Sequence, residues 1–218
     1  MSLSSHPSAP PSPWQRLLPW FTAAEGSESA CQLWAQASCC AAGLQLSYRL
    51  IWTPAEHSVL VPLRGADDRR SPRRRDGLWQ HTCFEAFVGV LGSEAYWEFN
   101  LAPSGDWNVY RFAGYRERQV PEQSYGALPL TVMGPRAAPP AADCRLVGPR
   151  ALLELEVCCQ LPPPLQERLQ ETLQEGSTLE LGLSAVLEGR DGELSYWALQ
   201  HPGSEPDFHD RRGWLLRL

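Results

Sequence analysis

Residues able to bind or react with a polar ligand are concentrated between positions 78 and 112. Carboxylates, an amide, a histidine and a guanidinium interrupt apolar runs there, and tryptophans lie beside them. Such polar groups hydrogen-bond to hydroxyls, while an indole ring stacks on the apolar face of a sugar ring. The segment therefore predicts a site for a small polar ligand, and its candidate residues are Trp79, His81, Glu85, Glu98, Asn100, Trp107 and Arg111.

Two of these residues, Glu85 and Glu98, also suit general acid–base chemistry. A glycosidase uses a pair of carboxyl groups, and their separation sets the stereochemical outcome. Positions on neighbouring strands do not fix that separation, and carboxylates are common on any solvated sheet face. We therefore expect no catalytic residue. The competing interpretation of the polar face is structural, with Trp79 packed at the edge of the core and Glu85 paired with Arg111.

A second polar cluster lies at residues 201–210, in the sequence HPGSEPDFHD. Imidazole and carboxylate groups are metal ligands, but the eight-residue spacing of His201 and His209 matches no tight metal motif. Turn or capping roles for Asp207 and Asp210 are favoured. We accordingly expect neither a metal nor a cofactor.

Alternating residue types indicate that a sheet positions the candidate site. The runs 79–91 and 94–102 predict a hairpin around Gly92 and Ser93. Its expected core side carries Phe84, Ala86, Val88, Val90, Trp97, Phe99 and Leu101. Glu85, Glu98 and Asn100 then share the opposite side with Trp79 and His81, where cross-strand neighbours lie about 5 Å apart.

The remaining segments predict more strands and a single helix. The strand expected at 106–112 has ambiguous parity, with Trp107 and Arg111 on one side and Tyr110 and Phe112 on the other. Further strands are expected at 44–52, 59–63, 128–133, 152–159, 179–187, 195–200 and 214–218. Residues 162–176 predict a helix that prolines open and Gly176 closes. We therefore expect one domain over residues 14–218, folded as an antiparallel β-sandwich. A disordered Ser/Pro/Ala-rich tail at 1–13 is expected to precede it.

Composition limits the function classes. The formal net charge of −6 argues against a nucleic-acid partner, and all 19 basic residues are arginine, which excludes lysine Schiff-base and P-loop chemistry. The seven cysteines form no CxxC motif and predict a reducing compartment. Neither a secretory signal nor a membrane-spanning apolar stretch is found, so we expect a cytoplasmic protein without a membrane partner.

An arginine-rich stretch at 65–77 has two interpretations. Its arginines could bind an anion or a phosphate group. The aspartates Asp67, Asp68 and Asp76 lie among them, however, and largely cancel the field. A solvated loop is therefore favoured, and the role of residues 69–75 stays open.

Several phrases of the sequence resemble the bacterial DOMON-like proteins, which are related to the family 9 carbohydrate-binding modules. These phrases are LWQHTCFEAF at 78–87, YWEFNLAPSGDW at 96–107 and YRF at 110–112. A looser similarity extends through 152–174 and the C-terminal YWAL and PDFH, so that it covers about residues 40–218. The resemblance implies a jelly-roll-like sandwich that binds a ligand on a concave sheet face.

The resemblance also implies roles for individual residues. Trp79 stands at a matching strand start, Glu85, Asn100 and Arg111 are at matching polar positions, and Trp197 is the implied aromatic partner. We therefore predict a non-catalytic domain that binds a carbohydrate or a sugar-like small molecule. Two alternatives stay open. One is a haem or metal binder using His81, His201 or His209. The two methionines, Met1 and Met133, match no haem motif, which argues against haem. The other is a hydrolase using Glu85.

Overall fold

The computed structural model describes residues 13–20, 31–40, 43–54, 59–63, 71–138, 149–172 and 178–218. Within these residues the secondary structure is almost entirely antiparallel strand, and the one α-helix is α1 (Pro163–Thr172). The predicted all-β sandwich with a single helix is thus confirmed. The tail predicted to be disordered falls mainly on residues 1–12, which lie outside the described residues, as does the predicted helix end at Gly176.

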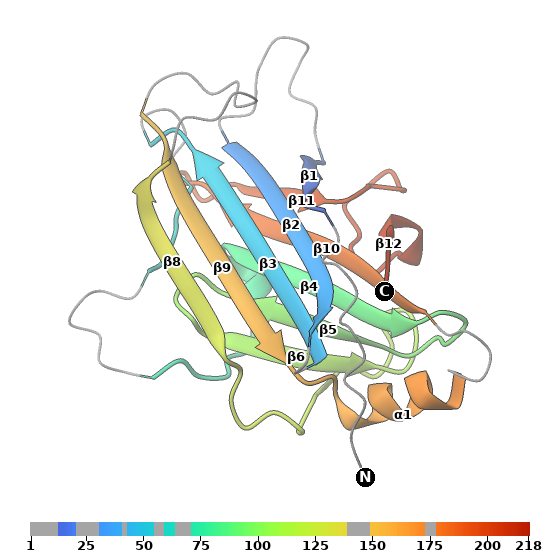
Figure 1. The fold of residues 1–218 in the computed structure, drawn as a ribbon. Coiled ribbons are helices and arrows are strands. Elements are labelled where there is room, and N and C mark those ends of the chain that lie inside the picture. Colours follow the sequence, from blue (N-terminus) through green and yellow to red (C-terminus); the bar gives the residue numbers. More distant parts are fainter. Residues whose placement is uncertain are drawn as a thin grey trace.

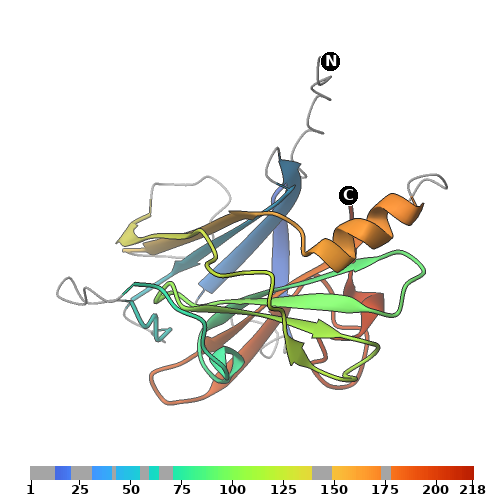
Figure 2. The ribbon, with the colours of Figure 1, turned by 90° about the horizontal axis from the view of Figure 1, so that it is seen from below.

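Two layers of strands face one another (Figures 1 and 2). Sheet A contains, in spatial order, β2 (Cys31–Cys40), β3 (Gly43–Trp52), β9 (Ala151–Cys159) and β8 (Leu130–Ala137). Sheet B contains β7 (Val120–Pro121), β6 (Trp107–Phe112), β5 (Tyr96–Leu101), β4 (Cys83–Val90), β10 (Leu179–Glu188) and β11 (Leu194–Ala198), with β12 (Leu216–Arg217) beside β10. β1 (Gln15–Pro19) joins the layers, because Gln15, Arg16 and Leu17 pair with β2 whereas Leu18 and Pro19 pair with β11.

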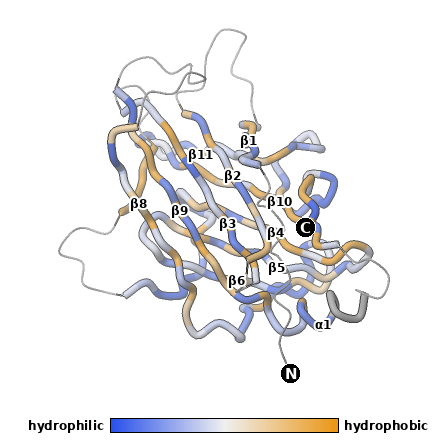
Figure 3. The backbone as a smooth tube through the Cα atoms, in the orientation of Figure 1, coloured by the Kyte–Doolittle hydropathy of each residue, from blue (hydrophilic) through white to orange (hydrophobic). Residues whose placement is uncertain are grey.

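The strands of sheet A follow the expected alternation. Along β3 the residues Leu44, Leu46 and Leu50 are buried against sheet B, and the residues between them face outward and are only half-buried. Apolar and polar residues alternate along the strands of this layer in Figure 3. A strand with one solvated face has this pattern because successive side chains point to opposite sides.

The strands of sheet B are buried on both faces. Every residue of β4 and β5 is buried. The inner face carries Phe84, Val88, Trp97 and Phe99 into the main core, as the parity predicted, and Leu165 of α1 joins this core. The outer face holds a second apolar cluster of Phe87, Tyr96, Tyr110, Phe112 and Trp214.

Three segments differ from the sequence expectations. β1 and β2 occupy a region whose apolar residues are dense but irregular, so alternation did not reveal them. The strand expected at 59–63 is reduced to an isolated bridge between Val59 and Gly189. The strand expected from residue 79 begins only at Cys83, because Gly77 adopts a left-handed φ of 74° and starts a 3₁₀ turn over Leu78–Gln80. No helix in the described part of the chain is long and apolar enough to span a membrane.

Candidate ligand-binding pocket

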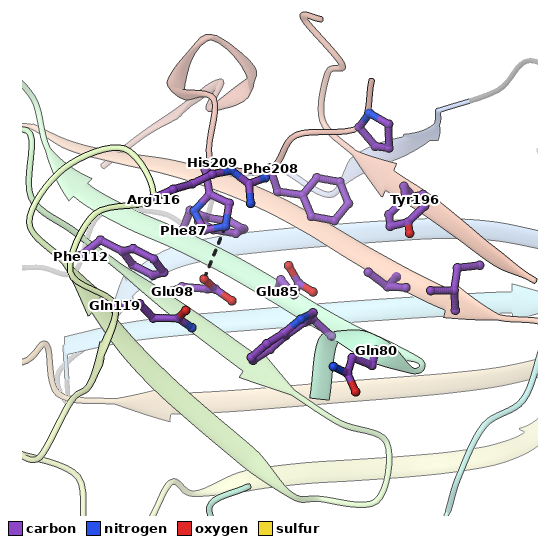
Figure 4. A pocket seen from close by; sticks show the side chains of 14 residues that line it. Gln80, Glu85, Phe87, Glu98, Phe112, Arg116, Gln119, Tyr196, Phe208 and His209 are labelled. Atoms are coloured by element: carbon purple, nitrogen blue, oxygen red, sulfur yellow. Dashed lines mark ion pairs between the residues drawn. The ribbon is translucent and has the colours of Figure 1, made fainter. Parts of the chain in front are cut away.

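A cavity of about 570 Å³ lies on the outer face of sheet B. Its floor is formed by Glu85 and Phe87 of β4 and Glu98 of β5. Four surrounding segments provide the walls: the 3₁₀ turn with Trp79 and Gln80, the loop with Arg116 and Gln119, β11 with Tyr196, and the segment of Pro206, Phe208 and His209. Figure 4 shows the two carboxyl groups on adjacent strands, with Arg116, Phe208 and His209 above them.

Strand register brings the two glutamates to one face. Glu85 pairs with Asn100, and Phe87 pairs with Glu98. Directly opposed residues of antiparallel strands share a face, as do residues two apart along one strand. Glu85 and Glu98 are therefore diagonal neighbours on the outer face, as the hairpin parity predicted.

Glu85 lies deep in this floor and has an unsatisfied oxygen. Its residue exposure is 3%, and its Oε1 atom has no hydrogen-bond partner. The Oγ atom of Ser184, which is opposite Glu85 on β10, also has none. From sheet A the hydroxyl of Tyr48 crosses the core and donates to the Glu85 backbone carbonyl at 2.6 Å, which fixes the strand beneath the carboxyl group. Burial, followed by the nearby Glu98 charge, raises the pKa of Glu85 well above its usual range.

Glu98 is held by a buried amide. The Nδ2 atom of Asn100 donates to Glu98 Oε1 at 2.6 Å, and the thiol of Cys83 lies 3.6 Å from Asn100 Oδ1. Burial raises the pKa of Glu98 to about 7, although the hydrogen bond from Asn100 and the charge of Arg116 work in the opposite direction. The floor thus contains two carboxyl groups that burial biases toward the protonated state.

His209 faces Glu98 from residues 206–214, the covering segment, which lies over the outer face of sheet B. Its Nε2 atom is 3.8 Å from Glu98 Oε2, and its Nδ1 atom is 2.7 Å from the hydroxyl of Tyr96. The Tyr96 oxygen already accepts from the Arg116 backbone N–H at 3.1 Å, so its own hydrogen is free to be donated to Nδ1. Burial and the charge of Arg116 lower the pKa of His209 to about 4. This arrangement assigns a neutral imidazole whose Nε2 hydrogen points toward Glu98.

Arg116 is the charged residue of the wall. Its guanidinium binds Asp207 Oδ1 at 2.9 Å, and 53% of its side chain is exposed. Arg116 has a left-handed φ of 54°, an uncommon conformation for a residue other than glycine, in the turn between Gly114 and Glu117. The ion pair links this turn to the segment that carries His209.

Much of the remaining wall is aromatic. The ring of Trp79 contacts that of Tyr110 edge-on, with 5.7 Å between their centroids. Phe87 packs on Phe208 and His209, and Phe112 stacks on Tyr96. Aromatic rings around buried polar groups suit a ligand with both apolar and hydrogen-bonding surface.

The predicted site residues fall into four groups. Trp79, Glu85 and Glu98 line the pocket. Asn100 lies beneath it, fully buried, and positions Glu98. His81 is outside the pocket lining, with its side chain 64% exposed and Nδ1 2.9 Å from Glu188.

Trp107, Arg111 and Trp197 form the fourth group, on the opposite side of sheet B. Trp107 and Trp197 are buried in the main core. Arg111 is paired with Trp97, whose side chain enters that core, and is exposed at the edge. Register thus settles the parity of β6 that the sequence left ambiguous, and it gives the outer face of β6 to Asn108, Tyr110 and Phe112. Trp197, on β11, enters the main core and does not face Trp79 across the pocket. The ligand-binding role predicted for the set stays a prediction.

Several lining residues were absent from the sequence-based set: Gln80, Phe87, Phe112, Arg116, Gln119, Tyr196, Phe208 and His209. Alternation is the signal that could have found Phe87, two residues after Glu85 on β4, and it also separates Tyr196 from Trp197. The contributions of Arg116 and His209 depend on loops that cross the sheet, for which the sequence has no local signal.

The histidines and aspartates of residues 201–210 have structural partners. Asp210 caps the 3₁₀ turn Arg211–Gly213 by accepting from the Arg212 backbone N–H, and Asp207 accepts from the His209 backbone N–H, which confirms their turn and capping roles. His201 contacts the Leu18 carbonyl oxygen at 2.9 Å. In the described part of the chain, no group of three or more His, Cys, Asp or Glu residues has a metal-binding arrangement.

The described end of the arginine-rich stretch also has a structural role. Arg74 donates to Asn108 Oδ1 at 2.8 Å and to the backbone carbonyls of Glu122 and Tyr125. Its guanidinium lies over the Trp107 ring, 4.5 Å from the centroid. These bonds fasten the segment before β4 to the edge of sheet B.

Comparison with known proteins supports the fold. No protein-family model matches the chain, and no curated protein matches it in sequence. The crystal structure of a putative carbohydrate-binding protein from Bacteroides uniformis ATCC 8492 is similar, with a TM-score of 0.56 and 15% sequence identity. The similarity covers 93% of this chain and 84% of that protein. At this identity it shows a shared fold.

Proposed function

We propose that this protein binds a carbohydrate or a sugar-like small molecule in the pocket on the outer face of sheet B, without transforming it. One observation carries the proposal. The Oε1 atom of Glu85 is buried without a partner in the floor of an aromatic-walled cavity. An unsatisfied buried polar atom costs about 1–3 kcal/mol, which a ligand hydroxyl can recover.

The walls favour a sugar over a purely apolar ligand. Trp79 and Tyr196 provide ring surfaces for the C–H faces of a pyranose, and Gln80 and Gln119 add amide groups at the rim. The resemblance to DOMON-like proteins and the shared fold with a putative carbohydrate-binding protein support the same ligand class. We also propose that the protein is related to the DOMON-like proteins and that its sandwich is jelly-roll-like. We further propose that it is located in the cytoplasm.

A panel of mono- and disaccharides, followed by titration calorimetry with the full chain, tests this function. Trp79→Ala is expected to weaken the affinity for the bound sugar at least about tenfold, because stacking on an aromatic ring contributes about 1.4 kcal/mol or more. Arg49→Ala is the control, since Arg49 is bonded to Glu154 on the outer face of sheet A and its loss should leave the affinity unchanged. Unchanged affinity in both Trp79→Ala and Glu85→Gln would place the ligand elsewhere.

A glycoside hydrolase is the second candidate, and the paired carboxyl groups favour it. Burial raises the pKa of both Glu85 and Glu98, and a carboxyl group kept protonated near neutral pH can act as a general acid. Release of nitrophenol from nitrophenyl glycosides, abolished in Glu85→Gln, would establish this activity. Binding of the same glycosides without turnover would support the non-catalytic function.

A further inference from the structure

The pocket floor contains the carboxyl groups of Glu85 and Glu98, and the described residues around it provide no cation dedicated to either. Glu85 Oε1 has no partner, and Glu98 Oε1 accepts from the uncharged amide of Asn100. His209 faces Glu98 as a neutral imidazole, because burial lowers its pKa to about 4. Arg116 is engaged with Asp207 at 2.9 Å. Two buried carboxyl groups without a dedicated cation are costly in their ionised state.

The other titratable groups near the pair do not supply a cation. They are Cys83 on β4, Tyr96 on β5, Tyr110 on β6, Tyr196 on β11, Asp76 bonded to Tyr110, and Asp207 in the covering segment. They are thiol, phenol or carboxyl groups, which carry no positive charge in either protonation state. Arg116 is therefore the cation of the described lining, and it lies at the rim with its charge shared with Asp207.

The aromatic walls complete a site for a positively charged group. Trp79, Phe87, Phe112, Tyr196 and Phe208 all contribute rings to the lining. The negative faces of such rings attract cations, and the attraction grows when water is excluded. A charged N–H donor also makes a stronger hydrogen bond to a carboxylate than a hydroxyl does.

We propose that the ligand carries an ammonium group that binds against Glu85 and Glu98, which makes amino sugars the ligand class of this pocket. The proposal rests on the proposed sugar-binding function and sharpens it. A neutral sugar can satisfy the lone Glu85 oxygen, but an ammonium also neutralises the acidic floor. The ring of the sugar would then lie against the aromatic wall.

Proton release gives this proposal a distinctive signature. Burial favours the protonated carboxyl groups, so an ammonium must displace a proton when it binds. The affinity for an amino sugar should therefore rise between about pH 5 and about pH 7, where the ammonium stays charged. A neutral sugar that accepts a hydrogen bond from a protonated carboxyl group should show the opposite trend.

Titration calorimetry of the full chain with glucosamine, galactosamine and mannosamine tests the proposal. Each is compared with its N-acetyl derivative and its neutral parent sugar, which keep the ring and remove the charge. We expect at least one amino sugar to bind about tenfold or more tightly than its neutral parent. The double variant Glu85→Gln/Glu98→Gln should abolish this preference and its pH trend, and Glu154→Gln on the outer face of sheet A should preserve both. The pH trend of the unmodified protein gives a test that needs no variant.

The outcomes separate this inference from the function on which it rests. Equal binding of neutral and amino sugars would overturn the ammonium site and leave sugar binding standing. Binding of tetramethylammonium or cadaverine with no sugar bound would support the ammonium site and overturn the sugar function. Failure of all these probes to bind would overturn both.

A second, independent observation lies on the outer face of sheet A. The Sγ atoms of Cys40 at the end of β2 and Cys158 on β9 are 2.8 Å apart, although the residues are 118 positions apart in sequence. β3 lies between their strands, and Cys40 pairs with Gly43 whereas Cys158 pairs with Gln45, two residues further along the same face of β3. Both cysteines are partly exposed, so a reagent can reach them.

We infer that Cys40 and Cys158 form a reversible disulfide by exchange with a small disulfide such as oxidised glutathione. In this exchange the two thiols of the protein are oxidised to one S–S bond, and oxidised glutathione is reduced to two molecules of glutathione. The spacing of the cysteines along the chain concealed this pair, because the order of β2, β3 and β9 in the sheet brings them together.

Peptide mapping of the full chain after treatment with oxidised glutathione tests the inference. We expect a peptide linking Cys40 to Cys158, loss of two titratable thiols, and a higher urea midpoint that dithiothreitol reverses. Cys40→Ser should abolish all three changes. Cys39→Ser is the matched control, since Cys39 is exposed and adjacent in sequence, and it should leave them intact. Mixed disulfides with glutathione at Cys40 or Cys158, without the linked peptide, would overturn the inference.

Discussion

The outer faces of the two sheets carry similar polar residues and hold them in opposite ways. On sheet A, Glu154 lies between Arg49 and Arg136, and 39% of the Arg49 side chain is exposed. On sheet B, Glu85 and Glu98 are 3% and 4% exposed and have no cation of their own among the described residues. A covering segment makes the difference, because Phe208, His209 and Trp214 lie over sheet B.

The two faces differ in whether water and arginine stabilise their carboxyl groups. Sheet A places its carboxylate where water and arginine stabilise it, which is the ordinary arrangement for a strand with one exposed face. Sheet B buries its carboxyl groups against the free-energy cost of removing them from water. Because sheet B bears this free-energy cost within an aromatic cavity, the buried carboxyl groups are the strongest argument that this face binds a ligand.

Removing Phe87 should produce the largest difference between the two faces. Phe87 is fully buried and contacts Phe208, His209 and Trp214, so Phe87→Ala should lower the free energy of unfolding by about 3–5 kcal/mol. The matched change on sheet A is Met133→Ala, at a side chain opposite Glu154 that is 40% exposed, and it should cost under about 1 kcal/mol. Urea denaturation monitored by tryptophan fluorescence measures both. Equal losses would mean that the covering segment does not pack as described.

Removing the amide beside each carboxylate should have a smaller effect. Asn100→Ala leaves Glu98 buried without its donor and should cost about 1–3 kcal/mol. On sheet A the side-chain amide of Gln45 donates to Glu156, and Gln45→Ala should cost under about 0.5 kcal/mol because water replaces the bond. The two variants are compared by the same urea titrations. A loss at Gln45 as large as that at Asn100 would remove the distinction between the faces.

Alternation in the sequence predicted the parts of the fold that depend on neighbouring strands. It identified β3, placed Phe84 and Trp97 in the core, and set Glu85 and Glu98 on the opposite face. These predictions succeed because a hairpin fixes its register locally. The same reasoning could not assign β6, where both parities combine aromatic and polar residues.

The walls of the pocket could not be predicted for a different physical reason. Arg116 and His209 reach the site from loops whose positions depend on contacts far apart in sequence, such as the ion pair of Arg116 with Asp207. Trp79 also depends on a loop, since the left-handed Gly77 turns the chain before β4. β4 and β5 are buried on both faces because the covering segment lies over their outer face. Alternation within these two strands does not indicate that such a segment is present.

The pKa values of the carboxyl groups shift in opposite directions on the two faces, and the pH dependence of stability tests this difference. Burial raises the pKa of Glu85, and that of Glu98 to about 7, from the value of 4.5 expected for an exposed glutamate. Between these pH values the unfolded chain has released protons that the folded protein retains, so the free energy of unfolding should fall as pH rises from about 4.5 to about 7. For Glu154, burial opposes the shift, but hydrogen bonds from Arg49 and Arg136 prevail and lower the pKa. Its contribution is therefore present above the unfolded pKa and is lost as pH falls.

Replacing one glutamate on each face should separate these opposite slopes. Glu85→Gln should flatten the fall toward neutral pH, because the buried group no longer titrates, and Glu154→Gln should remove part of the loss in acid. Urea midpoints measured from about pH 3 to about pH 8 give both profiles. A Glu85→Gln profile parallel to that of the unmodified protein would show that Glu85 is solvated like Glu154. In that case the pocket floor would be an ordinary polar sheet face, and the argument for a bound ligand would lose its main support.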